Sequence, residues 1–166
     1  MNARDYIQQL NLQPHPEGGF YRQTYRCLDS IPATLLPKRF GGDRPISTAI
    51  YYLLEHGDYS CFHRIKSDEC WHFYAGGPLD IHIIERNGYY HSVKLGNNIL
   101  LGEVYQYTVA ALAWFAVEPV EKTLFALAGC TVAPGFDFND FEMARKKNLL
   151  DLCPQHTSII DRLCRQ

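Results

Sequence analysis

Short hydrophobic runs separated by turn residues fill the chain from about position 20 to position 132. These runs are rich in β-branched and aromatic side chains, and turn signals return at intervals of roughly ten residues. This spacing is typical of an all-β sandwich or barrel. The predicted strands are Phe20–Arg26, Thr48–Glu55, Ser60–Ile65, Cys70–Tyr74, Leu79–Glu85, Tyr89–Leu95, Val104–Val109, Ala113–Val117 and Thr123–Val132.

Helical periodicity is found only at the two ends of the chain. Apolar side chains recur at helical spacing over positions 3–10, and Pro14 prevents the helix from continuing. Asn139 is the predicted N-cap of a C-terminal helix, because Glu142 follows at the capping-box spacing. A second short helix is expected from about Thr157. These helices would cover a β core rather than form a separate unit.

Length and composition favour one domain over residues 1–166. The chain is 46% hydrophobic, enough for one buried core and too short for two. Asn87-Gly88 predicts a tight hairpin turn and hence antiparallel strands. The stretch 28–45 contains several Pro and Gly residues and is expected to be a loop or a lid rather than a linker.

Charge and cysteine content exclude several classes of function. Sixteen basic against 18 acidic residues, with no basic run, argue against a nucleic-acid partner. No apolar run approaches the ~18 residues of a membrane span, and the N-terminus is too polar for a signal peptide. We therefore expect a cytoplasmic protein without a membrane partner. The six cysteines lack metal-binding or disulfide-scaffold spacing and are expected to be reduced thiols.

The segment 57–76 contains the most informative polar residues. Strand alternation places His63 and Ile65 on one face of a strand, and Glu69, Trp71 and Phe73 on one face of the next. If those faces coincide, His63 and Glu69 meet inside the barrel. A histidine beside a carboxylate is suited to proton transfer near neutral pH.

The same segment resembles the first signature motif of the cupin superfamily. Gly57, His63, Glu69 and Gly76 are in register with that motif, whereas Ile65 replaces its second histidine. In the weaker second motif, Phe115 stands where a metal-binding cupin has its last histidine. The resemblance therefore predicts no resident metal cofactor. If a divalent metal did bind, the remaining candidate ligands would be His63 and Glu69.

The other histidines give weaker signals. Strict alternation sends His72 to the outer face, where we expect it to be hydrogen-bonded, and only a bulge would turn it inward. Solvated or turn positions are the default expectation for His15, His56, His82, His91 and His156.

A wider resemblance covers nearly the whole chain. Three blocks, at positions 12–24 (containing His-Pro-Glu-Gly-Gly), 67–73 and 129–138, are similar to those of a little-characterised cupin family of small bacterial and fungal proteins. The resemblance implies an all-β, double-stranded β-helix (jelly-roll) barrel with short terminal helices, similar to dTDP-sugar epimerases and germin-like proteins. It also implies a homodimer, and it names no activity.

The candidate pocket combines His63 and Glu69 with aromatic and polar neighbours. Such a mixture of apolar surface and a few polar groups is suited to a small molecule, although the aromatic rings would equally fill a narrow barrel. The predicted ligand-binding residues are Glu17, Arg22, Trp71, Phe73, Gln106, Thr108, Trp114 and Phe115.

Two functions remain open, joined by binding of a sugar-like or carbonyl ligand such as a carbohydrate or nucleotide sugar. The first is a metal-independent isomerase or epimerase in which His63 removes a proton next to a carbonyl and Tyr51 acts as the acid. The second is a non-catalytic binding or sensing protein. A metal-dependent dioxygenase or oxalate-type enzyme is less favoured, because it needs the missing histidines.

Overall fold

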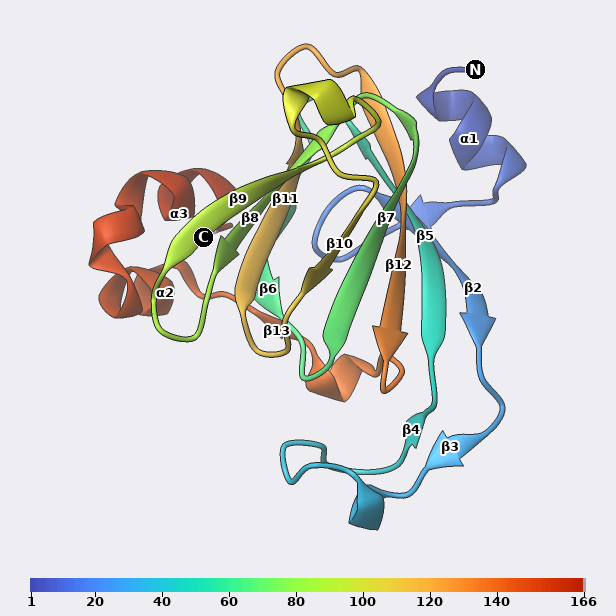
Figure 1. The fold of residues 1–166 in the computed structure, drawn as a ribbon, viewed down its shortest axis with the longest axis vertical. Helices are drawn as coiled ribbons and strands as arrows, with labels where there is room; N and C mark the ends of the chain where they lie inside the picture. Colours follow the sequence, from blue (N-terminus) through green and yellow to red (C-terminus); the bar gives the residue numbers. More distant parts are fainter. Residues whose placement is uncertain (166) are drawn as a thin grey trace.

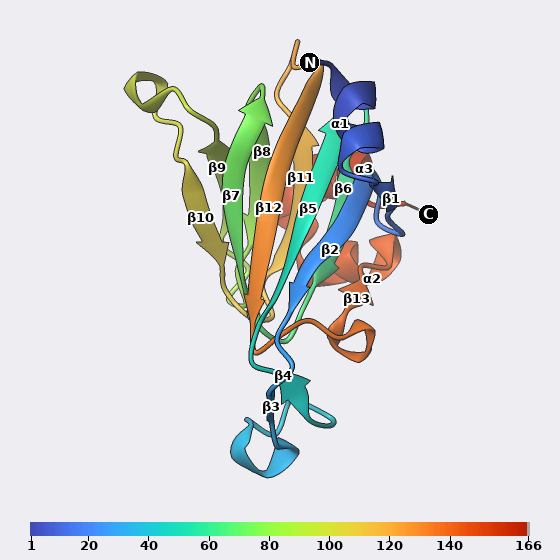
Figure 2. The same ribbon diagram turned by 90° about the vertical axis from the view of Figure 1, so that its right-hand side faces the viewer.

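Two antiparallel β-sheets face each other in the computed structural model, which describes residues 1–165 (Figures 1 and 2). In spatial order the six-stranded sheet contains β1 (Gln13–Pro14), β2 (Phe20–Arg26), β5 (Thr48–Glu55), β12 (Phe125–Ala133), β7 (Asp68–Gly76) and β10 (Gln106–Val109). The five-stranded sheet contains β13 (Glu142–Met143), β6 (Ser60–Arg64), β11 (Trp114–Pro119), β8 (Leu79–Ile84) and β9 (Tyr90–Leu95). The predicted all-β jelly roll with short terminal helices is confirmed.

Every predicted strand corresponds to a strand of these sheets, with ends that differ by a few residues. The β8–β9 hairpin turns at Asn87-Gly88 as expected. Gly88 has a φ of 82°, and its N–H donates to the Glu85 carbonyl at 2.8 Å. A positive φ there closes the turn without strain because glycine has no Cβ.

Helices cover two outer surfaces of the barrel. α1 (Ala3–Gln9) is closed by a capping box between Asn2 and Asp5 and packs beside the six-stranded sheet. α2 (Lys146–Leu152) and α3 (Thr157–Leu163) cover the outer face of the five-stranded sheet (Figure 1). Both faces of β8 are therefore largely buried, in contrast to a strand with one solvated face.

The predicted N-cap at Asn139 is wrong. Asp137 takes that role, and its side chain accepts from the Asn139 N–H at 2.8 Å at the start of a short 3-10 helix, η3 (Phe138–Asp140). Glu142 lies in β13 and accepts a hydrogen bond from Arg64, so it closes no capping box. The C-terminal α2 begins only at Lys146.

The stretch 28–45 forms an arm that projects beyond the end of the barrel (Figures 1 and 2). It contains β3 (Ser30–Ile31), η1 (Ala33–Leu35) and β4 (Arg44–Pro45). The arm is fixed at its base, where Arg44 donates two hydrogen bonds of 2.6 Å to the buried Asp140 carboxylate. The arm is anchored to the segment that follows β12 and projects away from the barrel interior.

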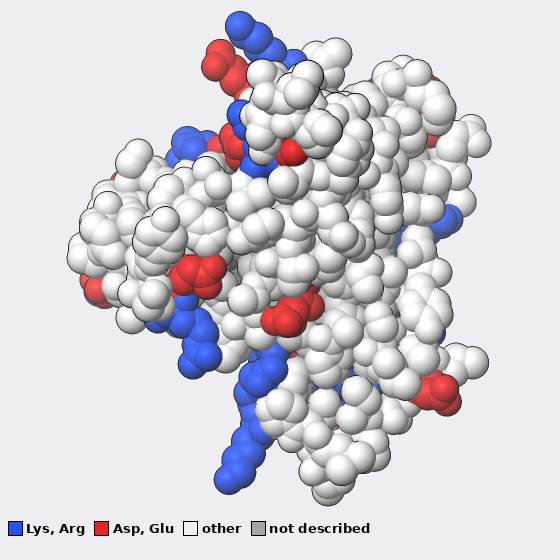
Figure 3. Space-filling view, in the orientation of Figure 1, with Lys and Arg blue, Asp and Glu red and all other residues white. Residues whose placement is uncertain are grey.

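The barrel interior is packed with large apolar side chains over much of its length. Trp71 and Phe115 are almost completely buried there and are joined by residues of β5, β8, β11 and β12. Outside, charged side chains are scattered and form no continuous basic patch on the face shown in Figure 3. Among residues 1–165, no helix has the length and apolarity to cross a membrane.

Candidate functional site

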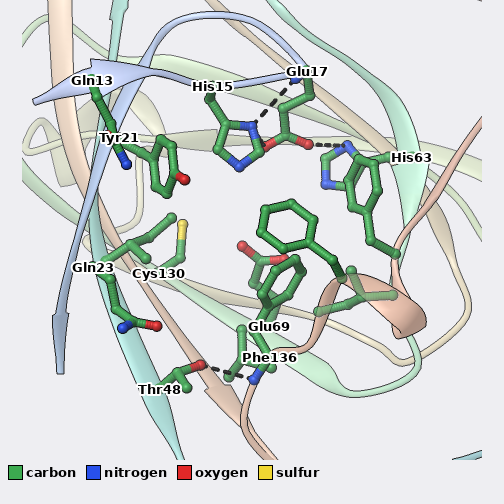
Figure 4. Close-up of a pocket in the computed structure, with 15 residues that line it drawn as sticks. Gln13, His15, Glu17, Tyr21, Gln23, Thr48, His63, Glu69, Cys130 and Phe136 are labelled. Atoms are coloured by element: carbon green, nitrogen blue, oxygen red, sulfur yellow. Dashed lines mark hydrogen bonds and ion pairs between the residues drawn. The ribbon is translucent and has the colours of Figure 1, made fainter. Parts of the chain in front are cut away.

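A cavity of about 270 Å³ lies inside one end of the barrel (Figure 4). The side chains that line it come from β1, β2, β5, β6, β7 and β12, from the β1–β2 turn, and from the segment after β12. They are Gln13, His15, Glu17, Tyr21, Gln23, Thr48, Ile50, His63, Ile65, Glu69, Cys130, Val132, Phe136, Phe138 and Phe141.

The His-Pro-Glu-Gly-Gly turn between β1 and β2 places Glu17 over the cavity. Gly18 and Gly19 have φ values of 120° and 68°, which only glycine adopts freely. A Cβ on Gly18 would lie 2.1 Å from the Tyr59 carbonyl oxygen, so the turn lies against the neighbouring backbone. The buried Tyr52 hydroxyl donates to the Gly18 carbonyl at 2.6 Å and fixes the turn in place.

His63 lies on β6 with one ring nitrogen held by two acceptors. Its Nδ1 is 2.8 Å from the Cys61 carbonyl oxygen and 2.9 Å from Glu17 Oε2. Both neighbours can only accept, so Nδ1 carries a proton and Nε2 is the nitrogen that titrates. Figure 4 shows this second nitrogen on the cavity side. The Phe115 ring, 4.0 Å away between centroids, supports the imidazole from the barrel core.

His15 also contacts Glu17 through its Nδ1. That nitrogen accepts a hydrogen bond of 3.3 Å from the Glu17 backbone N–H and lies 3.3 Å from Glu17 Oε1. The other ring nitrogen, Nε2, points into the cavity in Figure 4. The cavity thus receives one ring nitrogen from His15 and one from His63.

The buried charges shift one another's proton affinities. Burial opposes ionisation of Glu17, but the adjacent His63 and His15 lower the pKa of Glu17 below its ordinary value. Burial acts against a charged His63, yet Glu17 raises the pKa of His63 above its ordinary value. Burial, reinforced by the charge of Glu17, raises the pKa of Glu69 to about 7. Glu69 therefore titrates close to neutral pH, and His63 titrates above its ordinary range.

Three phenylalanine rings from the segment after β12 form the apolar side of the cavity. Phe136 and Phe138 meet edge to face at 5.0 Å, and Phe141 lies beside the His63 ring at 5.4 Å. Phe138 is 56% exposed and forms the rim. The Phe136 backbone N–H donates to the Thr48 hydroxyl at 2.9 Å, which ties the segment to β5.

The structure brings His63, Glu69 and Glu17 together around one cavity. It places Trp71, Phe73 and Phe115 inside the barrel as well, but within or against the packed core rather than in the cavity lining. Among the described residues of the arm, none lines the cavity.

Tyr51, predicted as the acid, and Arg22, predicted as a ligand-binding residue, do not line the cavity. The inward face of β5 is formed by Thr48, Ile50 and Tyr52, which places Tyr51 on the outer face. Arg22 pairs with Tyr51 in register, and its guanidinium lies 5.8 Å from the centroid of that ring. Both strands were predicted, and the error concerned only which of their alternating residues face inward.

Gln106, Thr108 and Trp114 also face away from the cavity. Gln106 is paired with His72 across β10 and β7 and hydrogen-bonds to it at 3.0 Å. Thr108 is exposed on the same face. Trp114 packs beneath the C-terminal helices, with the Arg64 guanidinium 4.4 Å from its ring centroid. The alternation of β10 and β11 directs their other residues inward.

The predictions for the remaining histidines had different outcomes. His72 lies on the outer face and hydrogen-bonds to Thr131 and Gln106, as predicted. His82 is not solvated, because it is buried between Tyr90 and Glu118. His15 lines the cavity, which single-residue reasoning missed although the glycine pair at 18–19 marked a constrained turn beside it.

The donor set does not fit a shared metal ion. Of the two positions where metal-binding cupins carry further histidines, Ile65 lines the cavity and Phe115 packs on the His63 ring. In the described part of the chain, no three His, Cys, Asp or Glu side chains are close enough together to hold one ion. We therefore derive no chemical step through a metal.

Comparison with known proteins places this geometry in a family. Residues 4–144 match the family described as Cupin superfamily (DUF985). A hypothetical protein from Leishmania major is similar over 100% of both chains, with 32% identity and a TM-score of 0.93. A protein from Shewanella oneidensis is 38% identical, with a TM-score of 0.88 over 99% of this chain and 98% of its own.

A more distant likeness concerns the fold alone. Oxalate decarboxylase from Bacillus subtilis has 14% identity and a TM-score of 0.55, and the match covers 90% of this chain and 36% of that one. No curated protein matches the chain. The family match over most of the sequence, together with the jelly-roll barrel and its enclosed His63 and Glu69, shows that this chain belongs to the cupin superfamily, in the family described as DUF985.

Proposed function

We propose that this cupin binds a small carbonyl compound and moves a proton within it, as an isomerase or epimerase. The observation that carries the proposal is the buried contact of 2.9 Å between His63 Nδ1 and Glu17, in a cavity that Glu69 also lines. A carboxylate that holds one nitrogen of an imidazole fixes the tautomer and increases the basicity of the other nitrogen. The sequence analysis had paired His63 with Glu69 and not with Glu17.

The proposed step needs one base and one acid. His63 Nε2 takes the proton from the carbon next to the carbonyl, and the electron pair of that C–H bond forms the double bond of an enol. The carbonyl oxygen takes the proton of the neutral Glu69 carboxyl group. When the deprotonated carbon carries a hydroxyl group, this intermediate is an enediol. His63 then returns its proton to the former carbonyl carbon, and the hydroxyl on the originally deprotonated carbon gives its proton to the Glu69 carboxylate and becomes the new carbonyl group. No oxidant or reductant is consumed.

Glu69 replaces Tyr51 as the acid in this proposal. Its pKa of about 7 keeps a large share of the carboxyl groups protonated at neutral pH. Epimerisation would require proton return on the opposite face of the carbon. Tyr21 lines the cavity and carries a hydroxyl suited to that role.

A second candidate function is ligand binding without catalysis. It is favoured by the Cys61 carbonyl, which lies 2.8 Å from His63 Nδ1 and competes with Glu17 for the same proton. A histidine fixed by a backbone carbonyl can be purely structural. Both functions use the same cavity, so they are separated by turnover rather than by binding.

Exchange with deuterated water tests the two functions. We expect the protein to catalyse the incorporation of solvent deuterium at the carbon next to the carbonyl group of its substrate. The exchange is measured by NMR over a panel of aldoses and ketoses. His63→Gln and Glu69→Gln should each slow the exchange about 10²–10⁴-fold, the usual contribution of general acid–base catalysis. His72→Gln, on the outer face, is the matched control and should leave the rate unchanged. Binding without any exchange would favour the second function.

A further inference from the structure

The cavity contains two carboxylates and no cationic side chain that is free to pair with a ligand. Among the described residues that line it, Glu17 and Glu69 are carboxylates, none is Lys or Arg, and His63 is already paired with Glu17 at 2.9 Å. The nearby Arg44 is already engaged by Asp140 through two hydrogen bonds. A phosphate or carboxylate that entered would lie beside like charges without a cationic partner, in a site with little water to screen them.

The remaining polar groups of the cavity are neutral and bind hydroxyl groups well. Gln13 and Gln23 provide amides, and Tyr21 and Thr48 provide hydroxyls. Each of these groups offers both donor and acceptor capacity, as does every hydroxyl of a ligand. His15 adds a ring nitrogen, Nε2, that can form a hydrogen bond with a hydroxyl. A polyhydroxy compound can satisfy this set without bringing a charge.

The phenylalanine rings and the volume of the cavity further narrow the class of ligand. Phe136, Phe138 and Phe141 add apolar surface to the cavity, which matches a ring with one C–H face and several hydroxyls. The volume of about 270 Å³ falls just below the range of roughly 300–1,000 Å³ that is usual for drug-sized ligands. One sugar ring fits this space better than a nucleotide sugar.

From these observations we infer that the ligand is a free, uncharged monosaccharide, and that the site rejects sugar phosphates and sugar acids. The inference rests on the proposed function and names its substrate class. Selection against anions arises from the ionised Glu17, joined by Glu69 in the fraction of molecules in which Glu69 has lost its proton. The amides and phenyl rings hold the neutral ring.

Binding to matched pairs of sugars tests the inference. D-glucose, D-mannose, D-fructose and D-xylose are compared by ligand-observed NMR with glucose 6-phosphate, mannose 6-phosphate, fructose 6-phosphate, D-glucuronate and UDP-glucose. We expect at least one neutral sugar to bind, and its anionic counterparts to bind at least tenfold more weakly. Equal or tighter binding of a phosphate, an acid or the nucleotide sugar overturns the inference. Failure of every neutral sugar to bind at 50 mM also overturns it.

A charge added to the rim provides a second test. Gln23 is exposed at the edge of the cavity, so Gln23→Arg places a cation there without disturbing the core. The variant should bind glucose 6-phosphate at least tenfold more tightly than the unmodified protein. Gln106→Arg adds the same charge on the outer face and should leave binding unchanged. If Gln23→Arg has no effect on phosphate binding, missing positive charge is not the cause of rejection.

The two proposals fail in different ways. A neutral sugar that binds without deuterium exchange leaves the substrate class standing and removes the catalytic function. Deuterium exchange into an anionic compound keeps the catalytic function and removes the substrate class. Binding and exchange are therefore measured on the same samples.

Discussion

The two ends of the barrel interior are built by the same strands and have opposite properties. One end is filled by Trp71, Phe115 and their apolar neighbours, whereas the other encloses a cavity with Glu17, His63 and Glu69. On β7 only one inward step separates Glu69 from Trp71. The packed end provides the burial that stabilises the barrel, and this allows the other end to keep buried ionisable groups that cost stability.

The largest predicted effect comes from opening the packed end. Trp71→Ala should lower the free energy of unfolding by about 3–5 kcal/mol, because it leaves a large void in the core. Trp71→Phe should cost much less, since it keeps most of the volume and removes the buried indole N–H, which has no hydrogen-bond partner. Urea denaturation measures both. A loss below ~1 kcal/mol for Trp71→Ala would contradict this division of the barrel.

The next effect concerns the ionisable end and its response to pH. The pKa of Glu69 is about 7 in the folded protein, above its ordinary value of 4.5, so the folded state binds the proton more tightly. Stability should therefore fall as pH rises from about 4.5 to 7, by about 3 kcal/mol in total. The raised pKa of His63 acts in the same direction at the upper end of this window.

Glu69→Gln separates the two contributions. The variant should lose most of the decline in stability between pH 5 and pH 7, measured by urea denaturation at each pH. An unchanged slope would assign the pH dependence to His63 or to other groups.

A smaller effect on stability is expected at the rim. Phe138 is largely exposed, so Phe138→Ala should change the free energy of unfolding by less than about 1 kcal/mol. It should nevertheless weaken binding of the neutral sugar severalfold, because a phenyl face of the cavity is lost. Calorimetric titration and denaturation on one preparation measure both. A stability loss as large as that of Trp71→Ala would show that the rim belongs to the core.

The smallest effect is expected on the outer face of the six-stranded sheet. Thr108→Val should change stability by no more than about 0.5 kcal/mol and leave binding untouched, because Thr108 is exposed.

NMR titration of two histidines compares the inner and outer faces of the barrel. His63 should titrate above its ordinary pKa because of Glu17, and His72 below it because of partial burial. Glu17→Gln should lower the pKa of His63 and leave that of His72 unchanged.

Local patterns predicted the fold well because each strand carries its own alternation and turn signals. The 57–76 segment placed His63 and Glu69 correctly, since two consecutive strands fix their relative phase. Tyr51 was misplaced because a strand with apolar residues on both faces does not reveal which face is inward. The contact between Glu17 and His63 was not predictable, because it joins a turn near the start of the chain to a strand 46 residues later.

That long-range contact sets an order of events during synthesis. The β1–β2 turn leaves the ribosome first, but it has nothing to rest on until β5 and β6 emerge, and the phenylalanine side of the cavity comes still later, after β12. Arg165, near the end of the chain, donates to the Pro16 carbonyl at 3.4 Å and contacts the same turn. A nascent chain therefore has no formed site until the segment after β12 has been synthesised, long after the β1–β2 turn, so the reactive centre is assembled later than the strands that surround it.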